Sequence, residues 1–195
     1  AIGSSNARNI GAKNSKSMYL AFLDDDDIWE KNYIKNSIKY LNSKTILLGR
    51  IFSKNSKKVI KIKSEKFKKH NIDLSNLYKK NPGIIGSNII ISKKAFHTIG
   101  GYDKKLPLGQ DKAIVIEGIK KGFKVLRTNA KIYFNENTLG ERNTDLIKFF
   151  SGKLIFYFRY KKKMDLYTQI SYFILLIKNL IYGVSKKLKK CLFNK

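Results

Sequence analysis

Four consecutive aspartates, Asp24 to Asp27, are the residues of this chain best placed to do chemistry. They follow directly on residues 18–23, Met-Tyr-Leu-Ala-Phe-Leu, a short apolar run that is typical of a buried strand. Carboxylates a few ångströms apart repel one another unless a cation lies between them. Asp24 and Asp26, two positions apart in an extended segment, would project to one side and share a hard ion such as Mg²⁺ or Mn²⁺. The sequence therefore predicts a divalent metal site, against the simpler alternative of a solvated acidic turn or helix N-terminus.

The elements that must position this acidic run alternate between helices and strands. Ligands of open α/β sheets bind at the carboxyl ends of the strands, and the aspartates lie at such an end. Ser5–Lys16 before the run and residues 29–41 after it have the apolar spacing of helices. Further strands are predicted at 45–52, 58–62, 87–91, 123–126 and 130–134, the first two forming a hairpin, and further helices at 93–98 and 110–121. Gly100-Gly101 and Gly122 are expected to end these two helices. This alternation predicts an α/β sheet.

From about residue 145 onward the sequence changes character. One continuous apolar stripe at helical spacing comprises Leu166, Ile170, Phe173, Ile174, Ile177, Leu180 and Ile181. The segment 145–195 carries 12 Lys and Arg against 2 Asp. Its longest uninterrupted apolar piece, Tyr172–Ile177, is too short to cross a bilayer, which needs roughly 20 residues. We therefore predict a globular part at 1–144 and a basic amphipathic helical tail at 145–195, which either lies on an anionic membrane or packs on the globular part.

Composition bounds the classes of protein that remain. With 195 residues and 43% hydrophobic content, the chain is long enough for one well-buried domain plus an appendage. The formal net charge of +27 favours anionic partners, although part of it reflects a general enrichment in Lys, Asn and Ile that is typical of an AT-rich bacterial genome. The single cysteine, Cys191, excludes a disulfide framework or a thiolate metal cluster built within the chain, and it fits a reducing compartment.

Two stretches of the sequence closely resemble the signature of the family-2 glycosyltransferases. Residues 3–11 contain a Gly-x-x-x-Ala-Arg-Asn-x-Gly pattern, and residues 19–29 contain a strand that ends in Asp-x-Asp and is followed by Trp29. The resemblance implies a GT-A-like, Rossmann-related mixed sheet flanked by helices. It also implies that Asp24 and Asp26 bind Mg²⁺ or Mn²⁺, and that Arg8, Asp24 and Asp25 contact the nucleotide-sugar. Two alternatives remain open: Asp25 and Asp27 could only shape the turn or cap the next helix, and Trp29 could only anchor that helix to the core.

A second block resembles the same family in order and spacing. Residues 99–103, Ile-Gly-Gly-Tyr-Asp, and residues 108–111, Leu-Gly-Gln-Asp, are similar to the family's Gly-Gly-Phe-Asp-Glu passage and the Glu-Asp that follows it. The resemblance implies that Asp111 is the general base, at the start of a helix whose dipole favours an ionised carboxylate. Such a base could take the proton from an acceptor hydroxyl while the hydroxyl attacks the anomeric carbon. Without the upstream motif, Asp111 would be interpreted as an ordinary helix N-cap.

The sequence departs from the family pattern at several places. Gln110 replaces a Glu before the base, Glu117 stands where many relatives carry Arg, and no His follows in residues 133–137, where some relatives supply a further metal ligand. The resemblance covers about residues 3–140 and omits roughly the first third of the catalytic domain, including the strands that bind the nucleobase and ribose. We therefore expect 1–144 to be a partial catalytic domain, incomplete at its N-terminus. If the sequence is complete, we expect this piece to be inactive alone; if it is truncated, the parent protein is the enzyme.

The function implied by the resemblance is transfer of a sugar from a nucleoside-diphosphate-sugar to a hydroxyl of a glycan or lipid-linked acceptor, in bacterial polysaccharide synthesis, by a metal-dependent inverting displacement. The alternative is a non-catalytic basic module that binds an anionic membrane or nucleic acid. Nucleic acid is the weaker partner, because the tail aromatics Phe149, Phe150, Phe156 and Phe158 lie on helical stripes beside Ile and Leu. We expect a cytoplasmic location, with the tail as the point of any peripheral contact with the inner membrane.

Overall fold

The computed structural model describes residues 3–53, 72, 74–134 and 146–193, the last eight of these by their backbone alone. A mixed sheet of five strands in the order β1-β4-β3-β5-β2 forms its centre. The strands are β1 (Tyr19–Ala21), β2 (Ile28–Trp29), β3 (Thr45–Ser53), β4 (Ile89–Ser92) and β5 (Lys124–Phe134). β3 and β5 pair in parallel, and the other three pairings are antiparallel. The predicted α/β class with a mixed sheet is confirmed.

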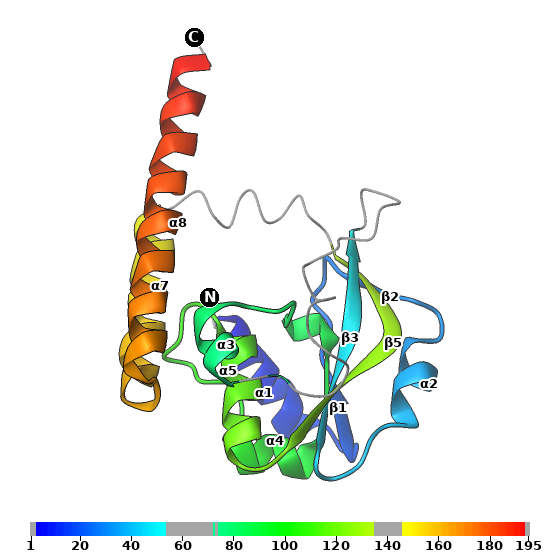
Figure 1. Ribbon diagram of the computed structural model, residues 1–195. Helices are drawn as coiled ribbons and strands as arrows, with labels where there is room; N and C mark the ends of the chain where they lie inside the picture. Colours follow the sequence, from blue (N-terminus) through cyan, green and yellow to red (C-terminus); the bar gives the residue numbers. More distant parts are fainter. Residues whose placement is uncertain (1–2, 54–71, 73, 135–145, 194–195) are drawn as a thin grey trace.

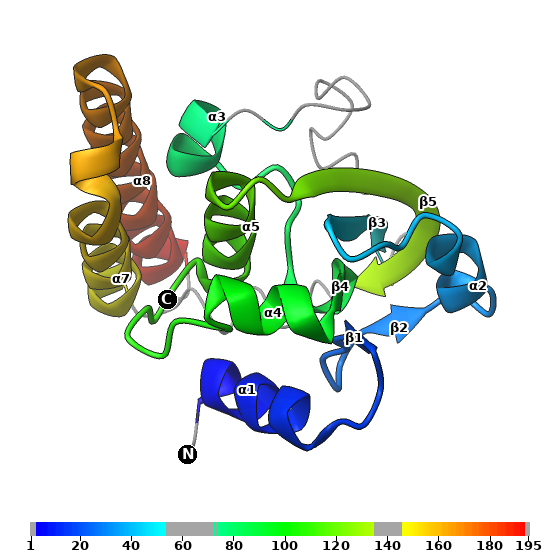
Figure 2. The same cartoon turned by 90° about the horizontal axis from the view of Figure 1, so that it is seen from below.

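Helices cover both faces of the sheet and form a further outer layer. They are α1 (Ser4–Asn14), α2 (Tyr33–Ile38), α3 (Leu74–Lys79), α4 (Lys93–Ile99), α5 (Gln110–Lys120), α7 (Leu146–Tyr160) and α8 (Leu166–Phe193), with 3₁₀ turns η2 (Gly86–Asn88) and η3 (Lys161–Lys163). Figures 1 and 2 show α2 on one side of the sheet, α1, α3, α4 and α5 on the other, and the α7–α8 hairpin outside these. α8 extends well beyond the body of the domain (Figure 1).

The alternation of side chains along the central strands divides the core in two. Ile89 and Ile91 of β4 join the large core beneath α4 and α5, whereas Ile90 between them joins a smaller core beneath α2. β3 alternates in the same way, with Leu47 in the smaller core. Because both faces of these strands are covered, their sequences are continuous apolar runs.

Helix α4 shows why some boundaries could be predicted from sequence. The Ser92 side chain accepts a hydrogen bond of 3.1 Å from the backbone N–H of Ala95, which caps the N-terminus. Gly100 ends the helix in the left-handed region, at φ 98°, where a residue without Cβ is unstrained. The predicted helix at 93–98 and its glycine stop are confirmed.

Some of the predicted elements have different bounds in the structure. The helix predicted at 29–41 is shorter, because Trp29 pairs with Ile132 in β2 and α2 begins only at Tyr33. The strands predicted at 123–126 and 130–134 are one strand, β5, whose pairing with β3 continues through an irregularity between Leu48 and Arg50. The strand predicted at 87–91 starts at Ile89, after the turn η2. The second strand of the predicted hairpin, 58–62, lies outside the described residues.

The α7–α8 hairpin packs on the domain through aromatic side chains. Phe156, Tyr160 and Tyr172 belong to the same core as the central strands. The buried Lys112 of α5 anchors this contact: its Nζ lies 3.9 Å from the centre of the Phe156 ring and donates a 3.2 Å hydrogen bond to the carbonyl of Tyr78. Burial, with a contribution from Lys153, lowers the pKa of Lys112 to about 7. The boundary predicted at residue 144, between a catalytic part and a tail, rests on the change in sequence character alone. It remains a proposal, because the hairpin and the central strands share one core.

Candidate active site

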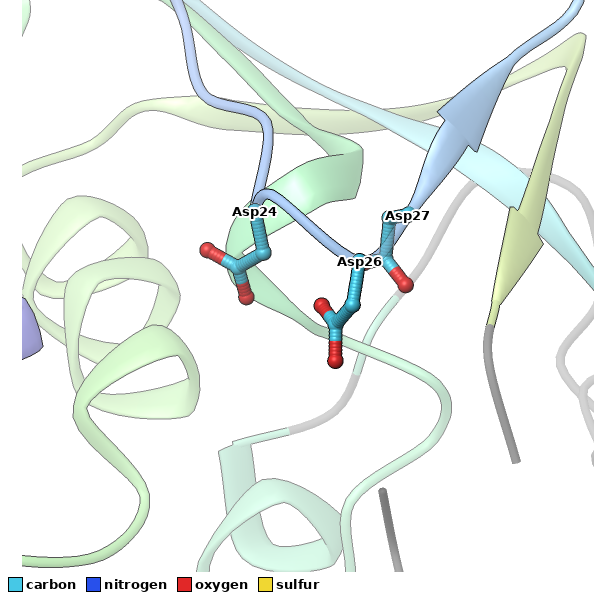
Figure 3. A group of neighbouring side chains, drawn as sticks. All are labelled: Asp24, Asp26 and Asp27. Carbon is cyan, nitrogen blue, oxygen red and sulfur yellow. The ribbon is translucent and has the colours of Figure 1, made fainter. Parts of the chain in front are cut away.

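The acidic run forms a tight loop between β1 and β2. It turns at Asp25 and Asp26, and the backbone N–H of Asp27 donates a 3.2 Å hydrogen bond to the carbonyl of Asp24. Carboxylate oxygens of Asp24, Asp26 and Asp27 lie within 4.8 Å of one another (Figure 3). The loop is thus not the extended segment that the sequence suggested, and the turn adds Asp27 to the predicted pair. Asp25 is exposed and lies outside this group.

Arg8 connects the acidic loop to the second predicted part of the site. From α1, its guanidinium forms ion pairs with Asp24 (Nη2 to Oδ1, 2.5 Å) and with Asp111 (Nη1 to Oδ1, 3.3 Å). Its side chain is only 13% exposed. Burial alone would lower the pKa of Arg8, but the nearby Asp111 and Asp24 outweigh burial and raise that pKa. Arg8, Asp24 and Asp111 therefore form one charged group, although Arg8 and Asp111 are 103 positions apart in the sequence.

Asp111 lies in the first turn of α5, where backbone N–H groups and the helix dipole favour a negative charge. Tyr102, from the loop before this helix, is buried next to it, and the Arg8 guanidinium carbon lies 5.2 Å from the centre of its ring. Burial raises the pKa of Tyr102 well above its ordinary value, and the charge of Asp111 raises it further. The Tyr102 hydroxyl consequently stays protonated beside the carboxylate.

Two polar residues that position the site were missed by sequence reasoning. The Asn9 side chain exchanges two hydrogen bonds of 2.8 Å with the backbone N–H and carbonyl of Tyr102, which ties α1 to the loop before Asp111. The Ser87 hydroxyl contacts both Asp24 and Asp27 of the acidic loop. The signal for Asn9 was its place directly after Arg8 in the first motif. Ser87 offered only a small polar residue at the start of an apolar run, which is a weak signal.

The positions that depart from the family pattern have ordinary surroundings. The Gln110 side chain donates a 3.2 Å hydrogen bond to the carbonyl of Pro107, in the loop before α5. Glu117 pairs with Lys120 one turn away, at 2.7 Å. Some relatives carry a His ligand in the segment that corresponds to residues 133–137. Most of that segment, residues 135–137, lies outside the described residues.

The geometry is suited to chemistry on a charged substrate. Three carboxylates within reach of one another offer hard oxygen ligands to a divalent cation, which fits Mg²⁺ or Mn²⁺. A guanidinium next to them suits a phosphate group. A carboxylate at a helix N-terminus, on the other side of that guanidinium, suits proton transfer.

The fold resembles that of a solved bacterial protein, TarS. S. aureus TarS, residues 1–349, superposes with a TM-score of 0.53 over 78% of this chain and 44% of the TarS chain, at 14% sequence identity. The same TarS fragment solved in complex with UDP gives a TM-score of 0.53 over 79% of this chain and 44% of that one, at 14% identity. At such identity the likeness shows a shared GT-A fold and nothing more.

The chain belongs to glycosyl transferase family 2, because residues 2–100 match that family. A protein of Rickettsia felis described as an uncharacterized glycosyltransferase is 33% identical over 147 residues, which cover 70% of this chain and 23% of that protein. A similarly described protein of Rickettsia bellii is 32% identical over 144 residues, covering 69% of this chain and 19% of that protein. The chain thus spans less than a quarter of the length of these curated relatives.

Proposed function

We propose that the protein transfers a sugar from a nucleoside-diphosphate-sugar to a hydroxyl acceptor, in a metal-dependent displacement that inverts the anomeric carbon. The observation that carries this proposal is the position of Arg8 between Asp24 and Asp111, because it brings the metal-binding loop and the general base of the family pattern into one site. Membership of glycosyl transferase family 2 supports the class of reaction. The solved complex of TarS with UDP supports a nucleoside diphosphate as the donor's leaving group.

Each predicted site residue has a role in this proposal. Asp24 and Asp26 hold a divalent ion, which when bound supplies positive charge to the departing diphosphate. Arg8 lies against the same diphosphate, and the exposed Asp25 is available to the nucleotide-sugar. Asp111 accepts the proton of the acceptor hydroxyl as that oxygen attacks the anomeric carbon from the face opposite the leaving group. The acceptor is a glycan or a lipid-linked glycan of polysaccharide synthesis.

A turnover assay on the full-length protein tests this function. UDP-sugars are supplied with Mn²⁺ and a mixture of glycan acceptors, and the release of UDP is followed. The expected result is release that stops when EDTA removes the metal and resumes when Mn²⁺ is restored. Release that continues unchanged in EDTA would contradict the metal-dependent mechanism.

We also propose that α8 lies on an anionic membrane surface. Its buried side chains, including Tyr172 and Leu176, face the domain, whereas its apolar stripe is exposed. The exposed apolar side chains are Leu166, Ile170, Phe173, Ile174, Ile177, Leu180, Ile181 and Val184. No residue of α8 is acidic, and Lys178, Lys186 and Lys187 are among its basic ones. An apolar stripe on a helix whose charged residues are all cationic complements anionic lipid. Among the residues that the structure describes, no helix is both long and apolar enough to cross a bilayer.

Replacing Ile177 by Asp is expected to weaken membrane binding by about tenfold or more, because the side chain is 54% exposed in the middle of the stripe and its burial in lipid would be lost. The measurement is co-sedimentation of the protein with phosphatidylcholine vesicles that contain phosphatidylglycerol. Asn179→Asp is the matched control, since it adds the same charge at an exposed position on another side of the helix. Equal binding of both variants would contradict the proposed contact.

A further inference from the structure

We propose that Ser87 is a positioning residue of the metal site: it holds Asp27 by a hydrogen bond and thereby leaves Asp24 and Asp26 as the carboxylates that face the ion. The inference rests on the proposed function, because it concerns which of three neighbouring carboxylates bind the metal. It assigns to Asp27 a structural role in the loop, although one of its carboxylate oxygens lies within 4.8 Å of oxygens of the other two.

Two parts of the acidic loop and the strand that follows it converge on this one serine. The Ser87 hydroxyl donates a 2.5 Å hydrogen bond to Oδ2 of Asp27 and accepts a 3.0 Å hydrogen bond from the backbone N–H of Asp24. The Ser87 carbonyl accepts a 2.8 Å hydrogen bond from Nε1 of Trp29. These bonds fix the first residue of the metal-binding group, its last residue and the strand that follows. The loop therefore has little freedom to spread its carboxylates apart.

Ser87 can act as an anchor because the turn η2 that carries it is itself fixed. The neighbouring Asn88 is fully buried, and its Nδ2 donates to the carbonyls of Gly49 (3.0 Å) and Gly83 (2.9 Å). Its Oδ1 accepts a 3.0 Å hydrogen bond from the backbone N–H of Ile85. The turn is thus held to β3 and to its own preceding loop by a side chain that has both donors and its acceptor satisfied.

Gly86, in the same turn, sets the position of Arg8. A Cβ at residue 86 would lie 2.3 Å from Nη2 of Arg8, so the guanidinium packs directly against the backbone there. Three consecutive residues therefore have three roles: Gly86 positions Arg8, Ser87 positions the acidic loop, and Asn88 holds the turn itself. The Gly-Ser-Asn turn acts as the common support for both ends of the site.

Burial separates Asp27 from the other two carboxylates. Asp27 is 6% exposed and Ser87 is 1% exposed, whereas Asp24 and Asp26 are half-buried. Burying a carboxylate is costly unless hydrogen-bond donors satisfy its oxygens, and the Ser87 hydroxyl is such a donor. Because Asp24 also has a bonded oxygen, its Oδ1 paired with Arg8, burial and not the hydrogen bond alone sets Asp27 apart. The buried Asp27 is poorly placed to bind an ion at the solvent-exposed side of the loop. Asp24 and Asp26 are then the ligands, which agrees with the spacing of the sequence motif.

The test measures the Mn²⁺ concentration that gives half-maximal UDP binding to the full-length protein, by titration calorimetry. Ser87→Ala is expected to raise that concentration by about 10- to 100-fold, the usual effect of losing a group that orients a metal ligand. Ser92→Ala is the matched control, because it also removes a buried serine hydroxyl with a backbone hydrogen bond, but at the N-terminus of α4. It should lower the unfolding midpoint and leave the Mn²⁺ requirement as in the wild type.

A second pair of variants separates orientation from ligation. Asp27→Asn keeps an oxygen that can accept the Ser87 hydrogen bond, so it should shift the Mn²⁺ requirement less than Asp26→Asn does. A larger shift for Asp27→Asn would make Asp27 a ligand and overturn the inference. Ser87→Ala with the Mn²⁺ requirement of the wild type, or no different from Ser92→Ala, would overturn it as well while leaving the proposed function intact. Wild-type protein that binds UDP without regard to Mn²⁺ would overturn both.

Discussion

Replacing Asp111 by Asn is expected to lower kcat by about 10²- to 10⁴-fold, the usual contribution of a general base, while the KM for the sugar donor stays near that of the wild type. Asn has the same shape as Asp and can still accept a hydrogen bond from Arg8, but it cannot take a proton at neutral pH. The loss should therefore fall on the chemical step. It is measured from initial rates of UDP release by the full-length protein at saturating acceptor.

The control for this substitution is Asp103→Asn. Asp103 lies eight positions earlier, has the same side-chain exposure of 22%, and forms an ion pair of 3.0 Å with Arg159 of α7. Asp103 lies outside the charged group of Arg8, Asp24 and Asp111, so this variant should keep the wild-type kcat. If Asp111→Asn turned over as fast as Asp103→Asn, Asp111 would not be the base and the second motif would have only a structural role.

Replacing Asp26 by Asn is expected to raise the Mn²⁺ concentration needed for half-maximal activity by more than about a hundredfold. Removing even an orienting neighbour of a metal ligand costs 10- to 100-fold in affinity, and a ligand should cost more. The amide is neutral and binds a hard divalent cation less strongly than a carboxylate does. Because Asp26 is half-buried in a loop turn, the substitution should leave the unfolding midpoint nearly unchanged.

The measurement for Asp26→Asn is the rate of UDP release as Mn²⁺ is titrated into metal-free protein. Asp103→Asn again serves as the control, since it removes one negative charge from the domain without touching the acidic loop. An Asp26→Asn variant with the Mn²⁺ requirement of the control would show that the ion, if there is one, is held by other residues.

Sequence patterns alone indicated the residues proposed for the two ends of the site, but not the contact that joins them. Asp24 and Asp26 follow a buried strand, and Asp111 stands at the start of a helix; both are recognisable local patterns. The contact of Arg8 with Asp111 depends on how α1 and α5 pack around the sheet, and no local pattern contains that information. Long-range placement of this kind comes from tertiary structure.

The incorrect predictions have specific physical causes. Residues 29–41 have helical spacing, but Trp29 is held in an extended strand by its pairing with Ile132, so tertiary pairing overrides local preference. Ser87 lies at the edge of an apolar run and was assigned to the strand, because the period of a run does not show where a 3₁₀ turn precedes it. The sequence left open whether Asp27 only shapes the turn, because four identical residues do not show which of them a turn brings together.

The claim that this domain binds a nucleoside diphosphate through a metal held by the acidic loop can be tested directly. The experiment is calorimetric titration of UDP into the full-length wild-type protein, first with Mn²⁺ and then with EDTA. The predicted result is binding at least about tenfold tighter with Mn²⁺, because an ion held by Asp24 and Asp26 would supply positive charge to the diphosphate. UDP binding of equal affinity in Mn²⁺ and in EDTA would contradict the claim.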